Sequence, residues 1–247
     1  MLQAYVYAKK NSYPFIVKEK NWNYTYDKGW HDYFESLHAY NPRVVYPNQE
    51  NYQHAQTDHL PNYTYKDYTD AMKELYRPNE YIRKAANEFI EKIGGPYNSI
   101  YIRRGDKISG KSKEMDAINV ESLIKKTGIK DGNVFIMSDD YSVVDQIREL
   151  LPNCTIFTLT DSRNSGYSAE RNRNDMADIK KKNAEELFTS MEVFHRGEKG
   201  WADNRSNLGR ILKVRGQDKV ILYPINYKIR PDKIVRLSRE ELIGDPV

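Results

Sequence analysis

The fold of this chain is decided by the stretch Asn98-Ser99-Ile100-Tyr101-Ile102-Arg103-Arg104-Gly105-Asp106-Lys107. Its first five residues form an apolar run typical of a buried strand, and two adjacent arginines follow directly. Open α/β sheets bind ligands at the carboxyl ends of their strands, and planar guanidinium groups match phosphate oxygens bidentately. The stretch therefore predicts a diphosphate site at a strand end. A structural salt bridge to Asp106 is the plain alternative.

Strands and helices alternate on the carboxyl side of this stretch. The pattern predicts strands over 98–103, 133–138 and 154–159, with helices over 119–128 and 141–151. Such alternation is typical of a parallel sheet with crossover helices, so the sequence predicts an α/β fold.

The residues before the sheet are interpreted as a first lobe. We predict helices over 2–8, 67–76 and 78–93, a strand over 13–17, an aromatic segment over 22–34 and a loop over 41–65. Gly94-Gly95-Pro96 then breaks the chain. The predicted division is a reduced amino-terminal α/β lobe (1–94), a Rossmann-like lobe (95–230) and a carboxyl-terminal tail (231–247). Because the chain opens on a helix with no strand before it, we expect a missing amino-terminal piece.

Composition narrows the function classes. The 247 residues include 39 Lys and Arg against 35 Asp and Glu, a net charge of +4. This excess is too small to indicate nucleic-acid binding and is compatible with a basic cleft for a nucleotide. Cys154 has no partner for an internal disulfide. No signal peptide or membrane-spanning run is recognisable, so the sequence predicts a cytoplasmic protein without a membrane span.

A second motif overlaps the first. Gly105 to Ser112 matches the phosphate-loop pattern G-x-x-x-x-G-K-[ST], and 134–140 resembles a strand followed by acids that would hold magnesium. A phosphate loop needs a helix directly after it, whereas the residues after Ser112 do not begin an apolar-faced helix and the next one is predicted from Asn119. A phosphate-loop NTPase or kinase is therefore the alternative hypothesis.

The segment from Asp161 to Lys182 is polar and contains Arg163, Arg171 and Arg173. We interpret it as a solvated charge run in preference to a mobile loop over an anionic ligand. Helical periodicity returns over 183–194.

Two later features suit a nucleotide. Residues 203–212 are typical of a loop entering a helix, with Asn204 or Ser206 as the cap, and a helix amino terminus can bind phosphate. A carboxylate accepts the N1–H and N2–H of guanine together, so Glu185 or Glu186 is a candidate for selecting a guanine nucleotide.

Together these residues resemble the α-1,6-fucosyltransferase family, which includes the nodulation and core fucosyltransferases. The segment 101–107 is similar to its His-x-Arg-Arg-x-Asp-Lys motif. The blocks 21–34, 75–78, 138–140 and 206–210 resemble its Asn-Trp-x-Tyr…Gly-Trp-x-x-x-Phe, Leu-Ile-Arg-Pro, Thr-Asp-Asp and Ser-Gln-Val-x-Arg segments. The likeness runs in order from about residue 2 to 215.

This resemblance implies a two-lobed, GT-B-like glycosyltransferase that transfers fucose from GDP-fucose to a glycan acceptor, with inversion and without a metal or other cofactor. The first lobe would carry the acceptor. Departure of GDP develops negative charge on the β-phosphate, and arginines can stabilise that charge where other transferases use a divalent cation. An inactive nucleotide-binding relative is a further alternative.

The resemblance also implies roles for single residues. The expected catalytic residues are Arg103, Arg104 and Lys107, with Glu114 as the base after an apparent three-residue insertion and Asp116 as its fallback. The donor-binding residues would be Tyr101, Asp106, Asp139, Asp140, Glu185, Ser206, Asn207 and Arg210. Trp22, Tyr24 and Trp30 would contact the acceptor. Tyr101 replaces the family's histidine and Glu185 its aspartate.

Overall fold

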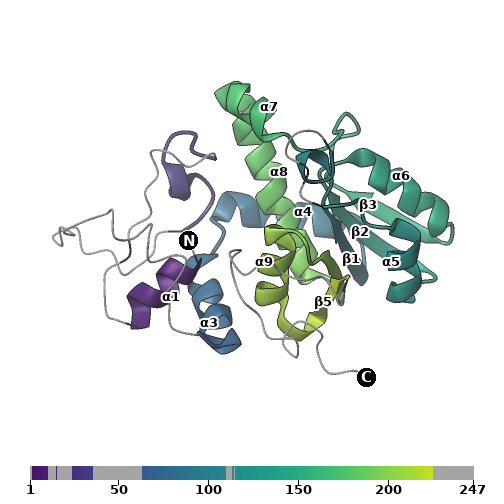
Figure 1. Cartoon of the computed structure of the whole chain (residues 1–247), viewed down its shortest axis with the longest axis horizontal. Helices are drawn as coiled ribbons and strands as arrows, with labels where there is room; N and C mark the ends of the chain where they lie inside the picture. The colour runs from purple at the N-terminus through teal and green to yellow at the C-terminus, as the bar shows by residue number, and fades with distance from the viewer. Residues whose placement is uncertain are drawn as a thin grey trace.

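A five-stranded parallel sheet forms the centre of the protein (Figure 1). The computed structural model describes residues 2–10, 15, 24–35, 63–109, 113 and 115–224. The strand order is β3-β2-β1-β4-β5. The bounds are Tyr97–Ile102 for β1, Gly132–Ser138 for β2, Cys154–Thr158 for β3, Gly200–Asp203 for β4 and Val220–Tyr223 for β5. The three predicted strands are confirmed, each to within one residue at either end.

Side chains of β1 alternate between two apolar layers, as the period of a strand requires. Ile100 and Ile102 pack into a core under α5 (Val120–Thr127) and α6 (Tyr141–Leu150). Tyr97 and Tyr101 face the opposite core, which the helices α4 (Glu80–Ile93), α8 (Ala177–Arg196) and α9 (Asn207–Gly216) cover. Figure 1 shows α5 and α6 on the far side of the sheet from α8 and α9. The result is the three-layer α/β/α arrangement that parallel sheets adopt.

Local capping sets the helix bounds. The side chains of Asn79, Asn119 and Asp140 accept hydrogen bonds from backbone N–H groups in the first turns of α4, α5 and α6. Gly94 ends α4 with a φ of 74°, a left-handed conformation that glycine adopts without penalty. The helix predicted from residue 78 therefore begins at Glu80, because Asn79 is its cap.

The first elements of the chain join the apolar cluster on the α4 side of the sheet. These elements are α1 (Leu2–Lys10), the short helix η1 (Gly29–Asp32) and α3 (Tyr65–Leu75). Their buried side chains belong to one apolar cluster with residues of β1, α8 and α9. The division at residues 94–95 and the tail over 231–247 stay predictions. The predicted strand 13–17 and most of the loop 41–65 lie outside the described residues.

The direction in which the sheet is built reverses between β1 and β4. From β1 the chain adds β2 and β3 through α5 and α6; it then returns through α7 (Ala169–Asn174) and α8 to place β4 on the other edge of β1. Such a reversal is a topological switch point, where α/β sheets open a crevice for ligands. Within the described ranges no helix has the length and apolar character that crossing a membrane requires.

Candidate functional site

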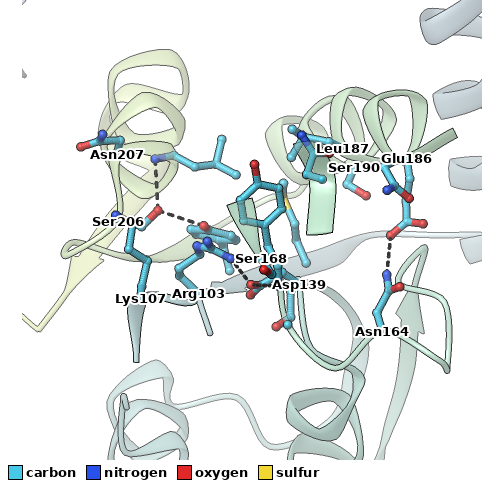
Figure 2. Close-up of a pocket in the computed structure, with 18 of the residues that line it drawn as sticks. Arg103, Lys107, Asp139, Asn164, Ser168, Glu186, Leu187, Ser190, Ser206 and Asn207 are labelled. Atoms are coloured by element: carbon cyan, nitrogen blue, oxygen red, sulfur yellow. Dashed lines mark hydrogen bonds and ion pairs between the residues drawn. The ribbon is translucent and has the colours of Figure 1, made fainter. Parts of the chain in front are cut away.

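A cavity of about 370 Å³ lies at this switch point (Figure 2). Its walls come from the carboxyl ends of β1, β2 and β4, from residues 164–175, from α8 and from the start of α9. Figure 2 shows Lys107, Ser206 and Asn207 at one end and Glu186 with Asn164 at the other, with Arg103 and Asp139 between them. The cavity thus has a basic end next to a helix amino terminus and an end that carries an acid.

Arg103 lines the cavity with its guanidinium held from three sides. Its Nη2 donates to Asp106 at 2.8 Å, its Nη1 donates to Asp139, and the group lies 5.0 Å from the centre of the Tyr167 ring. The side chain is 12% exposed. The salt bridge to Asp106 that the sequence offered as the plain alternative is therefore present. It leaves Arg103 facing the cavity, so the two interpretations are compatible.

Asp139 joins three segments that are distant in sequence. One of its carboxylate oxygens accepts from the backbone N–H of Arg104 at 2.7 Å, and the other accepts from that of Tyr167 at 2.8 Å and from Arg103. Its own carbonyl accepts from the N–H of Gly166 at 2.9 Å. Asp139 also lines the cavity. It holds two segments in one position: the turn after β1 that contains Arg103 and Arg104, which we call the arginine turn, and the loop after β3. Charge-assisted hydrogen bonds to a carboxylate are strong enough for this role.

Two glycines make this junction possible. Gly105 has a φ of 59°, and a Cβ placed on it would lie 2.2 Å from the carbonyl oxygen of Tyr167. Gly166 has a φ of 100°, and its Cβ would lie 2.5 Å from the Cα of Gly105. The backbones therefore touch where no other residue fits, with Asp106 N–H donating to the Tyr167 carbonyl at 2.9 Å. This first glycine of the phosphate-loop pattern serves a packing role.

Ser206 connects β1 to the start of α9. Its hydroxyl accepts from the backbone N–H of Leu208 at 3.1 Å, which makes it the cap of the helix, and lies 2.9 Å from the Tyr101 hydroxyl. Burial raises the pKa of Tyr101, with the charge of Asp139 adding to the effect, so this phenol stays protonated. Of the two predicted caps, Ser206 is the one used. The exposed Asn207 follows on the cavity wall.

Of the two acids proposed for guanine, Glu186 lines the cavity and Glu185 does not. Consecutive side chains of a helix point about 100° apart, so the two acids face different directions. A carboxylate oxygen of Glu185 lies 3.9 Å from Nζ of Lys181 on α8. Glu186 accepts from the Asn164 amide at 3.4 Å. Burial raises the pKa of Glu186 to about 7, with Asp161 adding to the shift and Lys182 opposing it. The geometry thus favours the second of the two sequence alternatives.

Arg104 does not line the cavity. It is 6% exposed and donates from Nη2 to the Ile118 carbonyl at 3.2 Å, below the arginine turn. Burial lowers the pKa of Arg104, an effect that nearby Asp140 opposes. Adjacent residues leaving a strand point to opposite sides, so only Arg103 of the predicted pair faces the site.

Three predicted donor-binding residues occupy supporting positions. Asp106 holds Arg103 and accepts from the N–H of Ala169 at 3.1 Å, at the start of α7. Asp140 caps α6. Arg210 is buried, with its Nε donating to the Asn204 carbonyl at 3.0 Å. None of the three lines the cavity, because capping and buried backbone contacts direct their side chains elsewhere.

The residues predicted for the acceptor separate into different environments. Tyr24 lines the cavity, and burial raises its pKa to about 12, so its hydroxyl is a hydrogen-bond donor at neutral pH. Trp30 is 1% exposed and stacks on Phe34 at 4.1 Å between ring centres. It is a core residue, since the aromatic segment packs on α8 through Phe188. Trp22 lies outside the described residues.

The two proposed bases are Glu114 and Asp116. Glu114 lies outside the described residues. Asp116 is highly exposed and pairs with Lys113 at 2.9 Å, which lowers the pKa of its carboxyl. The described residues between Lys113 and Asn119 form no helix, and α5 begins at Val120, as the argument against a phosphate loop predicts.

The interpretation of the segment 161–182 as a solvated charge run holds for only part of it, because many of its residues are exposed but others line the cavity. The segment contains α7 and the start of α8, and it supplies a polar wall of the cavity made of Asn164, Ser168, Arg171, Asn172 and Asp175. Arg163 fits the original expectation, since it is exposed and pairs with Asp161. The overlooked signal is Gly166 in a polar run directly after a strand. Arg205, at the end of β4, was also missed and lines the cavity.

Comparisons with known proteins identify solved structures with a similar fold. No protein-family model matches the sequence, and no curated protein matches it. Crystal structures of NodZ α-1,6-fucosyltransferase are similar in fold. The form co-crystallised with GDP has a TM-score of 0.55 at 11% identity over 86% of this chain and 85% of that one. The form soaked with GDP-fucose has a TM-score of 0.54 at 11% identity over 86% of each chain.

NodZ from Bradyrhizobium has a TM-score of 0.59 at 10% identity, over 90% of this chain and 89% of that one. At such identities the likeness concerns the fold. It confirms the predicted α/β class and, at the level of architecture, the resemblance to the fucosyltransferases.

Proposed function

We propose that this protein transfers fucose from GDP-fucose to a glycan acceptor, with inversion and without a metal. The observation that carries the proposal is the cavity at the switch point, with a basic end at Lys107 and Ser206, Arg103 beside it, and an acid, Glu186, at the other end. A nucleoside diphosphate has the complementary distribution of groups. The fold agrees, since NodZ crystals have been obtained with GDP and with GDP-fucose.

The basic end would receive the diphosphate. Arg103 is fixed by Asp106 and Asp139 before any ligand binds, so little side-chain entropy is lost on binding. Lys107 and the amino terminus of α9 at Ser206 add positive potential. Negative charge grows on the β-phosphate as the bond to fucose breaks, and preorganised donors stabilise that charge more than the ground state.

The acidic end would receive guanine. Ionised Glu186 can accept the N1–H and N2–H together, and the Asn164 amide, 3.4 Å away, holds its carboxylate in place. Adenine offers no such pair of donors, so the acid favours guanine.

Titration calorimetry with GDP, GDP-fucose, ADP and ATP, each in chelator and again with magnesium, tests the proposal. We expect metal-independent binding selective for guanine, followed by fucosyl transfer in chelator. Magnesium-dependent triphosphate binding would support the phosphate-loop alternative. GDP binding with neither transfer nor hydrolysis of GDP-fucose would indicate an inactive relative.

GDP affinity should rise between pH 5.5 and 8 because Glu186 must ionise to accept the guanine donors. The pKa of this carboxyl is about 7, so affinity should fall up to tenfold for each pH unit below 7. Calorimetry with ADP in parallel removes the titration of the terminal phosphate, which both nucleotides share. Glu186→Gln should lose the GDP-specific pH dependence and most of the selectivity over ADP. An unchanged profile in Glu186→Gln would contradict the assignment.

The same shift predicts the effect on stability. The folded-state pKa lies above the ordinary value of 4.5, so the ionised carboxylate costs stability as the pH rises from about 4.5 through 7. Glu186→Gln should therefore unfold at a higher denaturant concentration than the wild type at pH 8 and at a similar one at pH 4.5.

The acceptor hydroxyl needs a base, and we propose Glu114 with Asp116 as the fallback. Glu114→Gln should lower kcat about 10²-fold, since it removes the proton acceptor, while GDP affinity stays within twofold. Asp116→Asn is the matched control, because this exposed acid pairs with Lys113. A loss in Asp116→Asn alone would reassign the base.

A further inference from the structure

We propose that Arg205, oriented by Asp203, is the second guanidinium of the diphosphate site, in the place that the sequence assigns to Arg104. The inference rests on the proposed function and changes which residues would bind the diphosphate. The two arginines then follow two different strands, β1 and β4, and both line the cavity at the switch point. Neither Arg205 nor Asp203 belongs to the motif resemblance described above.

Arg104 is in the wrong place for a ligand contact. Its side chain is buried under the arginine turn, and one guanidinium nitrogen is used by the Ile118 carbonyl. Its backbone N–H is used by Asp139. Because Arg104 does not line the cavity, a diphosphate bound there would meet Arg103 and not Arg104, and we assign Arg104 a role in supporting the turn.

Arg205 has the contact with the cavity that Arg104 lacks, although its side chain is only 7% exposed. It lines the cavity next to Ser206, the cap of α9, and shares the wall with Lys107 and Arg103. The strands that carry the two arginines are adjacent, since Tyr101 of β1 pairs with Ala202 of β4. A diphosphate at the start of α9 would therefore meet one guanidinium from each side.

The hydrogen bonds of Arg205 fix its orientation and leave donors for a ligand. Nε and Nη2 each lie 2.9 Å from an oxygen of Asp203, and Nη1 donates to the Asp116 carbonyl. A guanidinium carries five N–H groups, so these three bonds leave two. Asp203 is fully buried, and the bidentate pair holds the fork as rigidly as Asp106 and Asp139 hold Arg103. Each arginine is thus preorganised by acids below it.

A purely structural salt bridge is the competing explanation, and the chain contains a matched example. Arg163 pairs with Asp161 through the same two atoms, with Nε at 2.9 Å and Nη2 at 2.7 Å, at the same separation of two residues. Arg163 is exposed, Asp161 is half-buried, and neither lines the cavity. Arg163→Met therefore measures what losing such a bridge does when no ligand is involved.

The test measures binding of GDP, guanosine and inorganic pyrophosphate to the full chain in chelator. Arg205→Met should weaken GDP and pyrophosphate at least tenfold, as loss of a charged hydrogen bond to phosphate predicts, and leave guanosine within twofold. Arg205→Lys, which keeps the charge without the fork, should be intermediate. Arg163→Met should bind pyrophosphate like the wild type. GDP and guanosine are compared at pH 8, where Glu186 is ionised, because Asp161 also acts on the pKa of Glu186.

Wild-type affinity for GDP and pyrophosphate in both Arg205→Met and Arg205→Lys would overturn the inference. So would a larger loss of pyrophosphate binding in Arg104→Met than in Arg205→Met, measured on protein whose circular dichroism shows it folded. If Arg103→Ala abolishes GDP binding and the Arg205 variants do not, the proposed function stands and this inference fails. If the wild type binds pyrophosphate without selecting GDP over ADP, the proposed function fails while Arg205 is still tested.

Discussion

Arg103→Ala is expected to lower kcat/KM for fucosyl transfer about 10³-fold, the effect of removing a preorganised donor from a developing oxyanion. Arg103 is the arginine of the β1 turn that lines the cavity, and two acids hold it there. Most of the loss should appear in kcat, because the charge on the β-phosphate is greatest in the transition state. Single-turnover kinetics with GDP-fucose in chelator measures it.

The control for this variant is another arginine with similar contacts. Arg148 pairs with Asp145 and lies 5.4 Å from the centre of the Tyr141 ring, on α6 and away from the cavity. Arg148→Ala should keep wild-type kinetics. Arg103→Lys, which retains charge for Asp106 and Asp139, should fold and lose at least tenfold in kcat because a lysine cannot form the bidentate fork. Full activity in Arg103→Lys and Arg103→Ala would remove the arginine from the mechanism.

Gly105→Ala is expected to lower the free energy of unfolding by at least about 3 kcal/mol, because two penalties add. The φ of 59° is disfavoured for alanine, and the new Cβ would lie 2.2 Å from the Tyr167 carbonyl oxygen. To relieve the contact the loop after β3 must move, and Tyr167, whose ring lies against Arg103, must move with it. Urea unfolding measures the stability, and GDP titration should show a weakened site.

Gly128→Ala separates the two penalties. Gly128 has a similar φ of 69° at the end of α5, and a Cβ placed on it would have no atom within 4 Å among the described residues. Its substitution should cost only about 1 kcal/mol from the backbone conformation. Equal losses in the two variants would show that the close approach of Gly105 to the Tyr167 backbone contributes nothing.

Much of the sheet was predictable because its strands carry their own signals. Val134 to Met137 is buried along its whole length, as a central parallel strand must be, and such runs are visible in sequence. β4 and β5 were missed because four residues each leave no room for a pattern. Their place in the sheet depends on pairing with β1 and with each other, which is information from the tertiary structure.

The site was predictable in its chemistry and less so in its geometry. The motif predicted Arg103, Lys107 and Ser206, which line the cavity, yet it could not decide which of two adjacent residues faces the cavity. Arg103 lines the cavity and its neighbour Arg104 does not; likewise Glu186 lines it and Glu185 does not. A shift of one residue in sequence therefore decides whether a side chain reaches the cavity. Side-chain direction follows from the exact start of a strand end or a helix, and sequence patterns locate such starts only to within a few residues.

The position of the cavity has a mechanical consequence. One half of the sheet, β1 to β3, meets the other, β4 and β5, along the short ladder from Ser99 to Tyr101 and from Gly200 to Ala202. A nucleotide held by Arg103 on one half and by the start of α9 on the other would connect the two halves across this ladder for as long as it is bound. A ligand stabilises the state that binds it, by an amount that grows with ligand concentration. Separation of the two halves along the β1–β4 ladder should therefore become rarer as the nucleotide concentration rises.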